Sequence, residues 1–172
     1  HQGSTCSSRN IWYNVNPNES AQILWMETMG SSHRVCFNDQ GVRHSDKFYG
    51  IYPFEDKIDS LKLCIWLNSS PIILHKLLTS FNSLGLGALK SPVYEVKKIP
   101  VPDLDLLQFD EKALESFLQR PIHDVVKEMS MPDRKKLEEP IMRMLGFSQQ
   151  QEEEMRLAII ALMSDRLDKA SS

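Results

Sequence analysis

The pattern of apolar and polar positions changes character twice along the chain. In roughly the first third, aromatic and branched side chains form short runs, and polar turn residues separate these runs. Runs of this kind predict β-strands that pack one face on a core and leave the other face in water. We expect four such strands, at residues 11–15, 21–29, 34–38 and 47–54.

Helical spacing replaces this pattern after residue 56. Apolar side chains then recur every three or four residues, at Ile58, Leu61 and Ile65. The letters NSSP at 68–71 interrupt the spacing, because Asn68 suits a C-terminal cap and Ser70 with Pro71 suits the start of a second helix. That second helix is predicted to carry one apolar stripe, formed by Leu74, Leu77, Leu78 and Phe81. We interpret the pair as scaffold and its turn as a structural joint.

The rest of the chain is predicted to be a loop, a strand and then helices. Residues 82–90 suggest a flexible loop, and 92–102 suggest a strand that ends in prolines. Predicted N-terminal caps of later helices are Asp110 and Asp133, and Ser148 precedes a predicted long helix. We therefore expect an α+β fold, with a β-rich domain containing the helix pair at 1–105 and an all-helical extension at 106–172.

Composition places the chain among packed globular proteins. Hydrophobic residues make up 41% and charged residues 25%, and no apolar run approaches the roughly 18 residues of a membrane span. Three widely spaced cysteines, at 6, 36 and 64, suit free thiols in a reducing cytoplasm. We expect a cytoplasmic protein with no membrane partner. Because the chain begins with His1, we interpret it as a piece of a longer protein.

Charge is distributed unevenly. The net charge of −3 argues weakly against nucleic-acid binding, but residues 1–100 hold 10 Lys and Arg against 8 Asp and Glu. Residues 101–172 hold 10 against 15, which is typical of a solvated acidic helical surface. Within that acidic part, we interpret the basic run 134–136 as a solvated helix face.

The sequence predicts no catalytic, cofactor or metal site in this chain. Its five histidines lack His-x-x-x-His spacing, and it contains no Gly-x-Ser-x-Gly elbow. Residues 31–50 instead interleave basic side chains with Asn and Gln in hairpin-like loops. Arg pairs with guanine, Asn and Gln pair with adenine, and Lys neutralises phosphates. The predicted DNA contacts are Arg34, Arg43, His44, Lys47 and Lys90; the alternative is a polar hairpin surface.

An ordered set of features resembles the target-recognition region at the C-terminal side of N6-adenine DNA methyltransferases of restriction-modification systems. The features are WY at 12–13, SDKFYGIYP at 45–53, LNSS at 67–70 and VYEVKKIPVPD at 93–103. The resemblance covers about residues 9–110. Specificity subunits of multi-subunit systems look similar at the Asn-Ser and Pro positions.

The resemblance implies a division of labour within a larger enzyme. In that family this region recognises a short duplex DNA sequence, while a separate N-terminal domain binds S-adenosylmethionine. That domain methylates an adenine flipped into an Asn-Pro-Pro-Tyr-like pocket, since the amine is unreachable inside the duplex. Here NPNE at 16–19 lacks the second proline and the aromatic residue. The expected partners are therefore double-stranded DNA and the catalytic domain of the parent chain, and this chain alone is not expected to be an enzyme.

Two alternatives stay open on the sequence. One is a non-catalytic interaction or assembly module that uses its acidic helical tail, and the other is a separate DNA-specificity subunit. Residues 106–172 could close the recognition region, dock on the catalytic domain or contact another subunit. DNA binding through several phosphates must weaken steeply with salt, so salt dependence separates DNA recognition from the assembly role.

Overall fold

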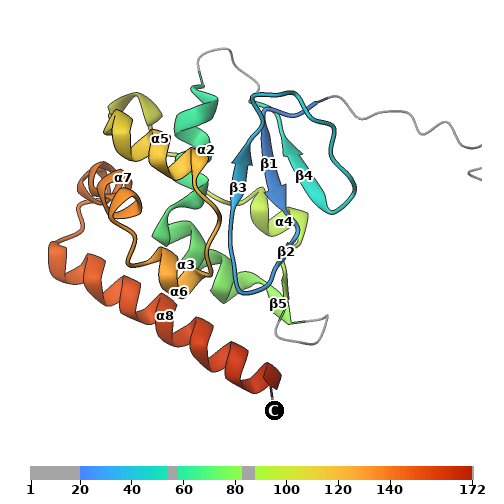
Figure 1. Cartoon of the computed structure of the whole chain (residues 1–172), viewed down its shortest axis with the longest axis vertical. Helices are drawn as coiled ribbons and strands as arrows, with labels where there is room; N and C mark the ends of the chain where they lie inside the picture. Colours follow the sequence, from blue (N-terminus) through green and yellow to red (C-terminus); the bar gives the residue numbers. More distant parts are fainter. Residues whose placement is uncertain (1–19, 54–57, 83–87, 172) are drawn as a thin grey trace, which may run out of the picture.

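The computed structural model describes residues 20–53, 58–82 and 88–171 (Figure 1). Within these residues the strands are β1 (Ile23–Met26), β2 (Thr28–Met29), β3 (Val35–Phe37), β4 (Phe48–Ile51), β5 (Phe81–Asn82) and β6 (Leu89–Lys90). The helices are α2 (Ser60–Asn68), α3 (Ser70–Thr79), α4 (Val93–Val96), a 3-10 helix (Leu104–Leu106), α5 (Glu111–Gln119), α6 (Val125–Glu128), α7 (Pro132–Met144) and α8 (Gln149–Ser171). Small antiparallel sheets followed by a helical segment confirm the α+β class. The strand predicted at 11–15 and Cys6 lie outside the described residues, whereas Cys36 and Cys64 are free thiols.

Two small antiparallel sheets hold the described strands. The first has the order β3-β1-β4, and the second has the order β2-β6-β5. In β1, Ile23 and Trp25 are buried, while Met26 is 37% exposed. This alternation is what the sequence pattern predicts for a sheet with one face on the core.

The joint between α2 and α3 lies one residue away from its predicted position. Ser69, not Asn68 or Ser70, is the cap residue of both helices. Asn68 stays helical because its side chain bonds the backbone of β3: its Oδ1 accepts from Val35 N at 2.9 Å, and its Nδ2 donates to Val35 O at 2.8 Å. Ser69 makes no side-chain cap bond. Instead the Glu138 carboxylate, from α7, accepts from the backbone N–H of Ser70 at 2.8 Å.

The strand predicted at 92–102 is wrong. Ser91 still follows the sheet pattern, since its N–H donates to Glu27 O at 2.9 Å. The carbonyl of Pro92 then accepts from the N–H groups of Glu95 and Val96, which makes α4 a single helical turn. Proline at the N-terminal end of a helix loses no hydrogen bond, because the first N–H groups have no partner within the helix.

Apolar packing joins the helical segment to the sheets. One buried cluster includes Trp25, Leu67, Phe117 and Ile141, and a second includes Met29, Ile73 and Met163. Each cluster contains residues from both sides of position 105. Helix α8 packs against α3 and α6 (Figure 1). The division into domains at 105 stays a prediction.

Charged side chains of α6, of α7 and of the residue that ends α5 form a buried network next to the α2–α3 joint. Arg120 contacts Glu128 and Asp133 at 2.6 Å each. Arg134 contacts Glu138 at 2.9 Å and donates to the carbonyl of Asn68. The expectation of a solvated face at 134–136 is therefore correct for the two exposed lysines and wrong for the buried Arg134.

One of the two predicted helix caps is confirmed, and so is the helix predicted after Ser148. Asp110 accepts from Ala113 N at 2.8 Å and begins α5. Ser148 precedes α8, and its Oγ accepts from Gln151 N at 3.3 Å. Asp133 is not a cap, because Met131 holds that place before α7. The Asp133 carboxylate bonds Arg120 instead.

Candidate nucleic-acid interface

A ten-residue connection carries three of the predicted DNA contacts. Residues 38–47 join β3 to β4, which lie on opposite sides of β1, and Figure 1 shows the connection passing along the outer side of β4. Asn38 holds its first turn. The Asn38 Nδ2 donates to Ala21 O at 2.7 Å and to Val42 O at 2.9 Å, and its Oδ1 accepts from Val42 N at 2.9 Å. The Asn38 amide is thereby committed to backbone groups rather than presented to a base.

Arg43 and Lys47 project from this connection into solvent. Arg43 is exposed, and the Lys47 side chain is 72% exposed. Asp46 lies 4.0 Å from the Lys47 ammonium, but a pair this long and this exposed contributes little. The ammonium group of Lys47 is therefore accessible to a phosphate.

His44 lies closer to the sheet than its neighbours. Its Nδ1 is 3.1 Å from Ser45 O. Its ring rests on Gly50 of β4, where an added Cβ would come within 2.8 Å of Nε2. His44 is therefore only partly accessible, and its ring depends on a glycine beneath it.

Lys90 lies on the outer face of the second sheet. The register places Thr28, Lys90 and Phe81 opposite one another, so their side chains share a face. The other face, with Met29 and Leu89, is buried. The Lys90 ammonium is 2.9 Å from the Glu27 carboxylate and is 44% exposed as a side chain.

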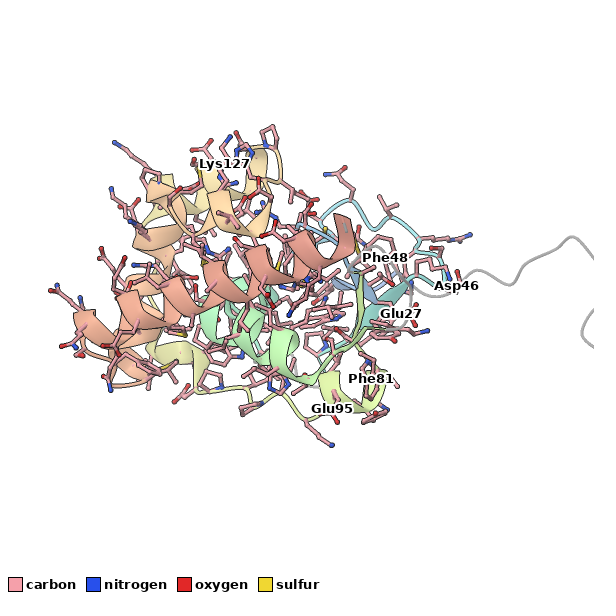
Figure 2. The ribbon with its side chains drawn as sticks, turned by 90° about the horizontal axis from the view of Figure 1, so that it is seen from below. Glu27, Asp46, Phe48, Phe81, Glu95 and Lys127 are labelled. Carbon is pink, nitrogen blue, oxygen red and sulfur yellow. The ribbon has the colours of Figure 1, made fainter. Side chains whose placement is uncertain are left out.

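Glu27 connects the two sheets and lies between two lysines. The hydrogen bond from Lys90 is the main cause that lowers the pKa of Glu27, and the charge of Lys47 adds to it. The Tyr49 hydroxyl donates to Glu27 at 3.1 Å. Burial, followed by this bond to a carboxylate, raises the pKa of Tyr49 to about 12. Figure 2 shows Glu27, Asp46 and Phe48 on the same side of the molecule as Phe81.

Arg34 is placed apart from the other predicted contacts. It is 8% exposed, and its guanidinium carbon lies 3.8 Å from the centroid of the Phe117 ring in α5. It also donates to the carbonyl of Phe117. Burial lowers the pKa of Arg34. Its role in DNA binding stays a prediction, and a base could reach this group only if α5 moved.

One surface residue of this region was not foreseen. The sequence pattern predicts Phe81 in the apolar stripe of the second helix, but that helix ends at Thr79 and Phe81 lies in β5. Its side chain is 54% exposed beside Lys90. The serine at position 80, which caps α3, is the local signal that could have separated Phe81 from the helix.

The described residues offer a binding surface of exposed cations. Among residues 20–53, 58–82 and 88–171, no group of three or more His, Cys, Asp or Glu side chains could hold a metal ion. No helix in this described part is both long enough and apolar enough to cross a membrane. The accessible groups at this surface are the guanidinium of Arg43 and the ammonium groups of Lys47 and Lys90.

Comparison with known proteins identifies the family. Searches of curated proteins and of solved structures gave no match. A family model described as "Type II methyltransferase M.Eco57I, C-terminal domain" matches residues 1–131. The match includes both sheets, the helix pair and every predicted DNA contact. The chain therefore belongs to the family of C-terminal domains of type II restriction-modification methyltransferases represented by M.Eco57I.

Proposed function

We propose that this chain recognises a short sequence of duplex DNA and presents its adenine to the catalytic domain of an adenine-N6 methyltransferase. The catalytic domain and its S-adenosylmethionine lie elsewhere in the parent enzyme. The observation that carries the proposal is the exposed pair Lys47 and Lys90 on either side of Glu27, within a domain of the methyltransferase family. Two sheets packed on the helix pair keep this surface rigid.

The exposed side chains divide into two roles. Lys47 and Lys90 suit phosphates, because an ammonium is a compact charge without directional preference. Their contacts would set the register of the duplex without reading its sequence. Arg43 suits a guanine edge, because its planar fork can donate two parallel hydrogen bonds. Arg43 is exposed on the 38–47 connection, which supports its assignment to a base edge in the major groove.

Salt dependence tests the phosphate contacts. The chain is titrated into a fluorescein-labelled duplex pool of random sequence between 50 and 200 mM salt. Two phosphate contacts predict a slope of log K against log salt of about −1.8, so affinity should fall about 12-fold over this range. Lys47→Gln and Lys90→Gln should each reduce the slope by about one.

A lysine apart from the proposed surface is the matched control. Lys127 in α6 is exposed, and Figure 2 shows it away from Glu27, Asp46 and Phe81. Lys127→Gln should leave the slope unchanged. Binding that does not depend on salt, or an equal effect of Lys47→Gln and Lys127→Gln, would refute the phosphate contacts.

Sequence recognition by Arg43 is tested in the parent methyltransferase. Arg43→Ala should weaken methylation of the preferred site by about 1–3 kcal/mol and relax the choice of base at one position. Arg43→Lys should not restore it, because an ammonium lacks the two-pronged geometry. Unaltered specificity of Arg43→Ala would remove Arg43 from the proposed recognition set.

An assembly role is the second candidate. On α8, Leu157 is 56% exposed and Leu162 is 40% exposed, and exposed apolar side chains on a helix suit contact with another subunit or with the catalytic domain. Oligomeric state that changes with Leu157→Glu, together with DNA binding that does not depend on salt, would favour this role over DNA recognition.

A further inference from the structure

Phe81 presents an aromatic ring beside a lysine on the outer face of the second sheet. The ring is 54% exposed, and its neighbour across the strand pair is Lys90. The opposite face of the same strands is fully committed to the core through Met29 and Leu89. Phe81 therefore cannot turn inward without reversing the strand register.

A second aromatic side chain and a second lysine lie close to this point. The Ser80 and Ser91 hydroxyl oxygens are 3.0 Å apart and join the residue before β5 to the residue after β6. In α4, Tyr94 is 50% exposed, and the Lys98 ammonium is 5.3 Å from the centroid of its ring. Figure 2 shows Phe81 and Glu95, the neighbour of Tyr94, along one margin of the molecule.

The charges facing solvent on this surface are positive. Glu27 and Glu95 each bond a lysine at 2.9 Å. In both pairs the carboxylate is the more covered partner: the side chains are 14% exposed for Glu27 against 44% for Lys90, and 20% for Glu95 against 64% for Lys98. An approaching partner therefore meets ammonium groups and aromatic rings, which together suit phosphates and base faces.

We propose that the Phe81 ring stacks on a DNA base that has lost its pairing partner, while Lys90 holds a neighbouring phosphate. This inference rests on the proposed function, which places DNA against Lys90. A base inside an intact duplex is already stacked on both faces, so an exposed ring gains a contact only where the duplex is opened. Extrusion of an adenine opens it and leaves its partner base unpaired.

Two duplexes and a series of variants test the role of Phe81. One labelled duplex is fully paired, and the other has a single abasic position that leaves a thymine unpaired; both are titrated with the full chain at 50 mM salt. The wild-type chain should prefer the abasic duplex by roughly 5- to 150-fold, the range of one base–aromatic stack. Phe81→Ala and Phe81→Leu should abolish the preference, and Phe81→Trp should keep it.

Leu157→Ala is the matched control, because Leu157 is 56% exposed and lies on α8. It should keep the full preference. Loss of the preference in Leu157→Ala, or its survival in both Phe81→Ala and Phe81→Leu, would overturn the stacking role. Equal weakening toward both duplexes in the Phe81 variants would also overturn it, since stacking on an unpaired base must discriminate between them.

The same titrations distinguish failure of the proposed function from failure of the stacking role alone. If the wild-type chain binds neither duplex, the proposed function fails and the stacking role fails with it. If it binds both with the steep salt dependence expected of phosphate contacts but without preference, only the role of Phe81 fails. Thermal unfolding of each variant, compared with the wild-type chain, separates loss of the ring from loss of the fold, and the Phe81→Leu variant keeps an apolar side chain at the position.

Discussion

Glu138 caps a helix to which it does not belong, and its removal should be costly. Its carboxylate accepts from Ser70 N at 2.8 Å and from Ser70 Oγ at 2.7 Å. It also lies 2.9 Å from the Arg134 guanidinium and 3.5 Å from that of Arg156. All of these groups are buried. Glu138→Ala would therefore leave a helix N-terminus without its acceptor and two buried arginines with fewer counter-charges.

The magnitude follows from these losses. A missing helix cap costs about 1 kcal/mol, and each hydrogen bond to a charged group contributes about 1.5–3 kcal/mol. Breaking a buried ion pair by removing one partner costs about 3–5 kcal/mol in total. Arg134 keeps its bond to the Asn68 carbonyl and Arg156 keeps Glu152, so the lower end, about 3 kcal/mol, is expected for Glu138→Ala.

Urea unfolding, followed by circular dichroism, measures this cost. At about 2–4 °C per kcal/mol for a chain of this size, the melting temperature should also fall by about 6–12 °C. Glu138→Gln keeps an oxygen that can accept from Ser70 N but loses the charge. Its free energy of unfolding should therefore lie between those of the wild-type chain and Glu138→Ala. The matched control is Glu139→Ala on the exposed face of α7, which should stay within about 0.5 kcal/mol of the wild-type chain. A loss below about 1 kcal/mol for Glu138→Ala, or an equal loss for Glu139→Ala, would refute the capping role.

Three further predictions concern stability and use the same unfolding assay. Gly50→Ala should lower the free energy of unfolding by about 1–3 kcal/mol, because the new Cβ would lie 2.8 Å from Nε2 of His44. Gly30→Ala is the control, because its new Cβ would meet no atom within 4 Å. Equal losses of stability in the two variants would contradict this reasoning. Burial lowers the pKa of Lys76 to about 7 in the folded chain. Between pH 7 and about 10, the Lys76 amine therefore binds a proton in the unfolded chain but not in the folded one. The free energy of unfolding should rise with pH across that window by up to about 1.4 kcal/mol per pH unit. Lys76→Met should flatten the rise, and an unchanged slope would show that this ammonium is not its source. Arg34→Ala should lower stability by about 2 kcal/mol through loss of its stacked and hydrogen-bonded contacts, and Arg34→Lys should recover little of it; a neutral Arg34→Ala would show that the ring contact is not structural.

Local patterns in the sequence were enough to predict most elements of the fold. Alternation along β1, helical spacing along α2 and the cap at Asp110 each depend on residues within one or two turns of the chain. The sheet's order and the packing of α8 on α3 depend on contacts that no local window contains. The α+β class was predictable from local patterns, because it depends only on the kinds of elements and their order along the chain.

Two departures from local expectation have a decisive partner distant in sequence. Asn68 continues its helix because its amide bonds Val35, 33 residues earlier. Arg34 is buried because Phe117, 83 residues later, covers it. The composition of residues 31–50 predicts a DNA contact at Arg34, but it carries no information about the distant Phe117 ring. Arg43 and Lys47 lie in a surface connection, where exposure is the default, and the structure does expose them.

The bond between Asn68 and Val35 has a consequence for how copies of this chain behave toward one another. β3 is the outermost strand of its sheet, so its outward N–H and C=O groups would otherwise invite a strand from a second molecule. The Asn68 amide occupies both backbone groups of Val35 at once, as a further strand would. A single side chain from a helix thus blocks strand pairing at Val35, on this edge of the sheet, and it does so at the turn that also joins the two scaffold helices.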